Sequence, residues 1–158
     1  MKKLRLAQIS AGVMLTIATA SAQSPTARVT KDVRFTMDDG IQIAADVYLP
    51  PSGSGPFPCL VELTPYRKET RAAEGASFLP GQGFALIEAD ARGTGGSNGE
   101  YDVVFSIREQ RDTAEVIEQA ATSLALPGVD KVCLPKIGMY GGSYSGIIQY
   151  LVASLPAG

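Results

Sequence analysis

The segment that most constrains the fold of this chain is Gly141-Gly142-Ser143-Tyr144-Ser145-Gly146. It follows the apolar run 137–140 and precedes the apolar run 147–153, so it joins a predicted strand to a predicted helix. Small residues at such a junction let the strand and the helix approach closely while one side chain projects from the turn. We therefore expect Ser143 to stand on a sharp strand-to-helix turn, the context of a nucleophile elbow.

Earlier segments predict a hairpin and then separate strands. Residues 28–50 alternate apolar side chains on both sides of Asp38-Asp39-Gly40, which is a strong hairpin signal. The apolar runs 60–63 and 84–89 predict two buried strands. A helix-compatible stretch over 71–79 and a turn over 80–83 separate them. Strands that alternate with helices predict an α/β architecture with a mostly parallel sheet.

Two further helices are predicted. Ser106 followed by Glu109 has the spacing of a capping box, and Pro127-Gly128 ends the first helix. Its expected apolar stripe consists of Ala114, Ile117, Ala121 and Leu124. Residues 147–155 are apolar nearly all round, which is typical of a helix buried at the centre of a larger structure.

The N-terminus predicts export. Lys2, Lys3 and Arg5 precede a weakly apolar stretch that ends at Ala20-Ser21-Ala22. This pattern is that of a signal peptide over residues 1–22, cleaved after Ala22, and its apolar stretch is too short to span a membrane. We expect a secreted or periplasmic protein whose residues 23–158 form one α/β unit. The formal net charge of −2 argues against nucleic acid as a partner, and nothing in the sequence sets an oligomeric state.

The two cysteines allow one pairing in an oxidising compartment. Cys59 and Cys133 each adjoin a strand-like run, and a disulfide between them is chemically possible. Buried free cysteine is also a common small apolar residue. The interpretation we favour from the sequence is two separate core residues.

Ser143 has the local context that nucleophilic catalysis requires. A serine hydroxyl attacks a carbonyl usefully when a base takes its proton and fixed donors receive the developing oxyanion. The backbone N–H of Tyr144, at the start of the helix, is placed to be one such donor. The common pattern G-x-S-x-G has its second glycine one place earlier than here. A glycine-rich turn with an incidental serine is the alternative interpretation.

Four segments together resemble the X-Pro dipeptidyl-peptidase and cocaine-esterase-like (CocE/NonD) serine hydrolases, which include α-amino-acid ester hydrolases. They are DGIQIAADVYLP (39–50), TPYRK (64–68), DARGTGGSNGE (90–100) and IGMYGGSYSG (137–146). Their order and spacing cover roughly residues 29–156. The resemblance implies the N-terminal half of an α/β-hydrolase domain, with a helical cap and a jelly-roll domain elsewhere in the complete protein. It implies no metal or organic cofactor.

The resemblance also implies roles for three residues. Ser143 would be the nucleophile, Tyr144 would donate its backbone N–H to the oxyanion, and Tyr66 would donate its phenol. The alternative for Tyr66 is a half-buried tyrosine at a strand end with its hydroxyl in water. The glycines of 90–100 do not match a phosphate-binding loop, and Asp90 and Arg92 are interpreted as charges that brace a turn.

Glu109 and Asp112 lie three residues apart near the start of a predicted helix. A general acid/base pair has little support there. We expect both carboxylates to be solvated, in a position that the helix dipole favours.

The 158 residues contain no histidine. In the α/β-hydrolase order the triad acid and histidine follow the serine, so both are expected beyond Gly158. The expected activity is acyl transfer to water from an ester or a peptide, with X-Pro dipeptides favoured and amino-acid or other esters as the alternative. A catalytically incomplete fragment or a binding module is the competing class.

Overall fold

A computed structural model of the chain describes residues 26–70 and 78–156. The predicted signal peptide and most of the predicted helix over 71–79 lie outside these residues. The elements with described bounds are, in chain order, β1 (Arg28–Thr36), β2 (Gln42–Leu49), β3 (Phe57–Thr64), α2 (Phe78–Gly81), β4 (Ala85–Asp90), α3 (Ile107–Thr122), β5 (Cys133–Met139) and α4 (Tyr144–Ala153). The predicted turn over 80–83 is therefore partly helical.

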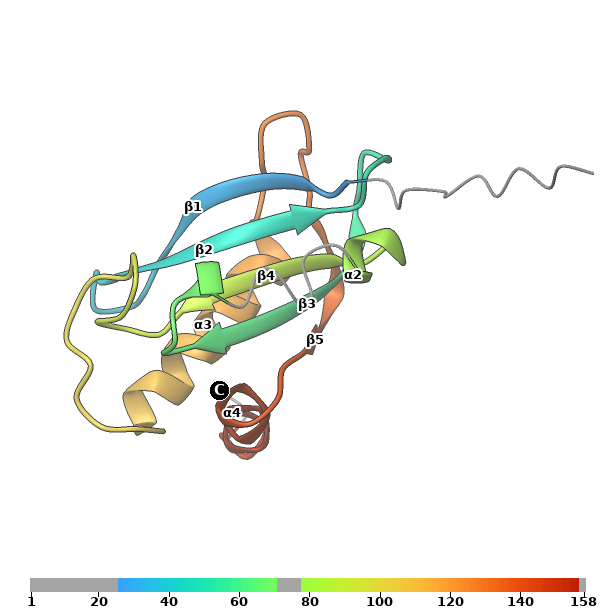
Figure 1. Ribbon diagram of the computed structural model, residues 1–158. Helices are drawn as coiled ribbons and strands as arrows, with labels where there is room; N and C mark the ends of the chain where they lie inside the picture. Colours follow the sequence, from blue (N-terminus) through green and yellow to red (C-terminus); the bar gives the residue numbers. More distant parts are fainter. Residues whose placement is uncertain (1–25, 71–77, 157–158) are drawn as a thin grey trace, which may run out of the picture.

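The strands form a five-stranded sheet in the order β1-β2-β4-β3-β5 (Figure 1). β1 and β2 form the predicted hairpin, in which the Gly40 N–H donates to the Met37 carbonyl at 2.9 Å. β2 is also antiparallel to β4, whereas β3 lies parallel to both β4 and β5. The α/β architecture is confirmed, with a sheet that is parallel on the side that leads to Ser143.

One face of the sheet packs against α3 through apolar side chains. Successive residues of a strand point to opposite faces, so alternate positions of β2, β3 and β4 share this side. They form the core with Val116 and Ala120 of α3. The sheet contribution includes Ile43, Ala45, Val47, Leu49, Val61, Leu63, Ile87 and Ala89, all of them buried.

The intervening positions form a second face that is mostly buried and carries acidic side chains beside apolar ones such as Ala44 and Leu86. Asp46 of β2, Glu88 of β4 and Glu62 of β3 are paired in register across the three strands, and each is at most 2% exposed. Lys68 Nζ approaches this face, 3.4 Å from the Asp46 carboxylate and 3.1 Å from that of Asp32. Because both faces are covered, β2 does not show the alternation of buried and exposed residues that a hairpin open to water on one side would have.

α3 begins where it was predicted to begin, but its buried residues are more polar than the predicted apolar stripe. The hydroxyl of Ser106 accepts from the Glu109 N–H at 3.1 Å and caps the helix, which ends at Thr122 before Pro127. Two members of the predicted apolar stripe lie at the core, since Leu124 is buried and Ile117 packs against the core while partly buried, whereas Ala114 and Ala121 are only partly buried. The residues of α3 that are buried are Glu109, Gln110, Asp112, Thr113, Val116 and Ala120. Four of these six residues are polar, and hydrogen bonds or ion pairs satisfy their side chains.

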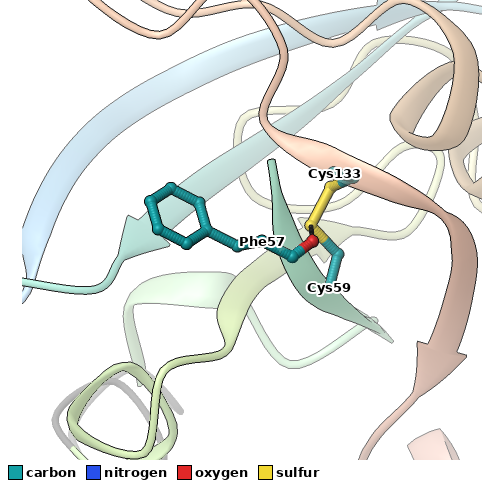
Figure 2. Close-up of a disulfide and its surroundings, with 3 residues drawn as sticks. All are labelled: Phe57, Cys59 and Cys133. Atoms are coloured by element: carbon teal, nitrogen blue, oxygen red, sulfur yellow. Dashed lines mark hydrogen bonds between the residues drawn. A yellow bond between two sulfur atoms is a disulfide. The ribbon is translucent and has the colours of Figure 1, made fainter. Parts of the chain in front are cut away.

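Cys59 and Cys133 form a disulfide, so the prediction of two separate cysteines was wrong. Cys133, the first residue of β5, pairs in register with Phe57 of β3, and the two Cα atoms of the disulfide are 5.5 Å apart. Figure 2 shows the bond crossing from β3 to β5 close to Phe57. The disulfide lies in the apolar core and joins the two strands that lead to Tyr66 and Ser143.

α4 follows the turn at Ser143 and contacts β3 and α3. Ile148 is fully buried, but Ile147 is 50% exposed and Tyr150 is 82% exposed. The described residues thus cover only one side of this predicted central helix. None of the helices in the described part of the chain has both the length and the apolar character that crossing a bilayer requires.

Candidate active site

Ser143 has a backbone conformation that is costly for a residue with a side chain. Its φ is 53° and its ψ is −119°, between the end of β5 and the first residue of α4. The Ser143 carbonyl accepts from the N–H groups of Gly146 at 3.0 Å and Ile147 at 2.9 Å, which begins the helix at once. Such strain costs about 1–3 kcal/mol and is commonly kept at functional sites. Ser143 is exposed to solvent.

The glycines around Ser143 are not equally required. Gly141 has φ +136°, and a Cβ there would collide with the Cβ of Ser145 and lie 3.1 Å from Glu62 Oε1. A Cβ on Gly142 would meet nothing within 4 Å. A small residue is therefore required at position 141, whereas a Cβ at position 142 would meet no other described residue.

The topology brings Tyr66 to the same edge of the sheet as Ser143. β3 and β5 are parallel neighbours, Tyr66 lies just after the end of β3, and Ser143 lies just after the end of β5. The ring of Tyr66 meets the ring of Tyr144 edge to face, with centroids 5.9 Å apart and an angle of 77° between planes. Tyr66 is 54% exposed, so the sheet edge does not enclose its side chain.

Tyr144 presents its backbone N–H beside Ser143. As the first residue of α4, Tyr144 has no acceptor for this N–H within the helix. The N-terminus of a helix also favours negative charge. The three residues predicted from the sequence, Ser143, Tyr66 and Tyr144, are thus brought to one edge of the sheet.

The side chain of Tyr144 belongs to a buried network that the sequence did not reveal. Its phenol donates to the carboxylate of Glu109, 2.8 Å from Oε1 and 2.7 Å from Oε2. The hydroxyl of Tyr101 lies 3.0 Å from the same phenol oxygen. Glu109 is 4% exposed, so the expectation of a solvated carboxylate was wrong. The capping-box spacing was a partial signal, because it located Glu109 at the helix start but not its contact with Tyr144.

Burial dominates the electrostatics of this pair. It raises the pKa of Glu109, against hydrogen bonds from Tyr144 and from the Phe105 N–H, which lower it. Burial also raises the pKa of Tyr144, and the hydrogen bonds with Tyr101 and Glu109 add to the effect. The Tyr144 phenol therefore keeps its proton through the ordinary pH range and remains a donor.

The turn after β4 is braced by charge, as predicted. The Asp90 carboxylate is fully buried and accepts from the backbone N–H groups of Lys68 and Gly96, both at 2.7 Å. Arg92 Nε lies 2.8 Å from Asp112, and Arg92 Nη1 lies 2.7 Å from Asp39. Asp112 is 1% exposed, so the expectation that it is solvated was wrong. These contacts fix the turn that faces the start of α3.

Comparison with known proteins gives consistent matches. The family model of the X-Pro dipeptidyl-peptidase (S15 family) matches residues 39–157. Cocaine esterase from Rhodococcus sp. (strain MB1 Bresler) is 30% identical over an alignment of 135 residues that covers 79% of this chain and 21% of that protein. This chain therefore spans about a fifth of the length of that relative.

Solved structures agree on the architecture. A CocE/NonD family hydrolase from Staphylococcus aureus matches with a TM-score of 0.65 at 26% identity, over 81% of this chain and 25% of that chain. An α-amino acid ester hydrolase matches with a TM-score of 0.62 at 23% identity, over 85% of this chain and 24% of that chain. The sheet, the turn at Ser143 and α4 correspond to the N-terminal part of an α/β-hydrolase fold.

Proposed function

The chain belongs to the X-Pro dipeptidyl-peptidase (S15) family of peptidases and esterases, and on that premise we propose that Ser143 is the nucleophile of a serine hydrolase. The observation that carries the proposal is the strained, exposed backbone of Ser143 at the carboxyl edge of parallel strands, beside two candidate oxyanion donors. A strained residue held in such a position is a feature of functional sites more than of ordinary turns.

The proposed reaction is acyl transfer to water. Ser143 Oγ attacks the carbonyl carbon of an ester or amide while a histidine takes its proton, and the oxyanion accepts hydrogen bonds from the Tyr144 N–H and the Tyr66 phenol. The histidine then protonates the leaving group. Water next attacks the carbonyl carbon of the acyl-enzyme while the histidine takes its proton, and the histidine returns a proton to Ser143 Oγ as the acyl group leaves. The 158 residues contain no histidine, so this proposal requires a histidine outside them.

Two substrate classes are in competition. The match to the X-Pro dipeptidyl-peptidase family supports cleavage of X-Pro dipeptides from peptides. The 30% identity to cocaine esterase favours hydrolysis of small-molecule esters as the second candidate. With the predicted signal peptide, the proposal places this activity outside the cytoplasm, on a small substrate and without nucleic acid.

The test is an assay of the full-length protein on Gly-Pro-p-nitroanilide and on p-nitrophenyl esters. We expect hydrolysis of at least one substrate, and loss of about 10⁶-fold in kcat in Ser143→Ala, as removal of a serine nucleophile produces elsewhere. The preferred substrate decides between peptidase and esterase. A wild-type protein inactive on both would favour the non-catalytic class, and an active Ser143→Ala variant would exclude Ser143 as nucleophile.

The role of Tyr66 has its own test. Tyr66→Phe keeps the ring that meets Tyr144 and removes only the phenol. Loss of one oxyanion donor lowers kcat by about 10²- to 10³-fold. A Tyr66→Phe enzyme with unchanged kcat would show that the phenol faces water and takes no part.

A further inference from the structure

Glu109 connects α3 to the candidate oxyanion site on α4. Both carboxylate oxygens meet the phenol of Tyr144, which is 35 residues away in sequence. Oε2 also accepts from the backbone N–H of Phe105 at 2.9 Å. Hydrogen bonds to a buried carboxylate are stronger than those between neutral groups. Glu109 is therefore a strong anchor for a tyrosine whose own backbone adjoins the nucleophile.

A second strained residue completes this anchor. Phe105 has φ 58°, a left-handed conformation that is rare for an aromatic residue. Its N–H is held by Glu109 and by the Tyr144 oxygen at 3.2 Å, and its carbonyl accepts from Gln110 Nε2 at 2.9 Å. Its ring stacks on that of Tyr144, with centroids 4.2 Å apart. Strain that several contacts maintain together is typical of a site that must be rigid.

The anchored side chain controls both candidate oxyanion donors. The first donor is the backbone N–H of Tyr144 itself. The second is the phenol of Tyr66, whose ring rests edge to face against the Tyr144 ring. Among the described residues, nothing lies within 4 Å of where a Cβ on Gly142 would stand, so that position of the turn is not packed. The Glu109 contact holds the turn from the side of α3.

We propose that Glu109 is a positioning residue for oxyanion stabilisation, which acts by anchoring the Tyr144 phenol and so fixing the Tyr144 N–H and the Tyr66 hydroxyl. This inference rests on the proposed function and names the part of the fold that supports it. Oxyanion donors act through preorganisation, so they need supporting residues that hold them to within a fraction of an ångström. Glu109 touches no reacting atom in this account.

The experiment uses the full-length protein with Glu109→Gln and Tyr144→Phe, each of which removes the charged hydrogen bond and keeps the shape of the side chain. Glu118→Gln, at an exposed glutamate of the same helix, is the matched control. The measurements are kcat, KM, the thermal midpoint and the affinity for a boronic acid, whose tetrahedral adduct with the serine has an oxygen in the oxyanion position.

We expect kcat to fall by about 10- to 100-fold in both variants, since a misplacement of about 1 Å costs about 10²-fold. Affinity for the boronic acid should fall by a similar factor, while KM stays within about threefold because a transition-state contact is lost. The double variant should lose little more than either single one, because both changes remove one contact. Glu118→Gln should match the wild type.

If Glu109→Gln keeps the wild-type kcat and the wild-type affinity for the boronic acid, this inference fails while the proposed function stands. So would a loss confined to KM or to the thermal midpoint. If Glu109→Gln does not fold, Tyr144→Phe decides by the same two measurements, because it retains the ring contacts with Phe105 and Tyr66. A wild-type protein without hydrolase activity would instead contradict the proposed function, and this inference would fail with it.

Discussion

The two faces of the central strands β2, β3 and β4 are both mostly buried but are stabilised by different physics. The face against α3 is apolar, and Leu63, Ile87 and Val116 are fully buried there by the hydrophobic effect. The opposite face carries Asp46 and Asp90, both at most 1% exposed, with the Lys68 ammonium 3.4 and 3.9 Å from their carboxylates. The first face should tolerate small losses of volume, whereas the second depends on one buried cation.

Removal of the Lys68 ammonium should have the largest effect on the free energy of unfolding. Burial acts to lower the pKa of Lys68, but hydrogen bonds with Glu69 and Asp32 and the charge of Asp46 raise it above its ordinary value of 10.5. Lys68→Met leaves Asp46 buried without its ion pair, which should lower the free energy of unfolding by about 3–5 kcal/mol. Urea denaturation of the full-length protein measures this loss of free energy of unfolding.

Arg67→Met is the matched control. Arg67 is exposed and lies 3.9 Å from Glu69, so its loss should cost about 0–1 kcal/mol. A raised pKa means that the Lys68 contribution is complete below pH 10.5 and is lost only as the pH rises through the folded value. The difference between the two variants should thus be the same at pH 6 and pH 9. Equal costs for both variants would show that the polar face does not depend on Lys68.

The disulfide should have the next largest effect, on the apolar face. Cys59 and Cys133 close a loop with a sequence separation of 74, so their replacement frees a long segment of the unfolded chain. Cys59→Ala/Cys133→Ala should lower the free energy of unfolding by about 2–5 kcal/mol. The wild type unfolded with reductant present should lose a similar amount. No change in either experiment would mean that the two sulfurs are not joined in solution.

A change of side-chain volume on the apolar face should have the smallest effect on the free energy of unfolding. Ile87 is fully buried at the centre of β4, between β2 and β3. Ile87→Val removes one methylene group and should cost about 0.5–1.5 kcal/mol in the same urea titration. A cost as large as that of Lys68→Met would remove the distinction between the two faces.

The sequence predicted the parts of the fold whose signals are local. The hairpin turn at 38–40, the apolar runs of β3 and β4, and the turn at Ser143 all depend on neighbours within a few residues. Four motifs in order then indicated the family, and the match over residues 39–157 confirms it. The elements were therefore predictable because propensity and pattern agree with the final structure.

The contacts that the sequence did not predict join distant segments. Glu109 was expected in water because helix starts favour solvated acids, but Tyr144 and Phe105 satisfy it inside the protein. Lys68 was seen only as part of a motif, and its approach to Asp46 depends on how the segment after β3 covers the sheet. Disulfide pairing needs the register of β3 and β5, which no local pattern sets.

The most direct test of the account is covalent labelling of the full-length protein with a fluorophosphonate, followed by mass spectrometry of its peptides. The account predicts one adduct, on Ser143, formed in step with the loss of hydrolytic activity and absent in Ser143→Ala. Ser145→Ala is the matched control, because Ser145 is 1% exposed and should not react. An adduct on another residue that abolishes activity, with Ser143 unmodified, would contradict the central claim.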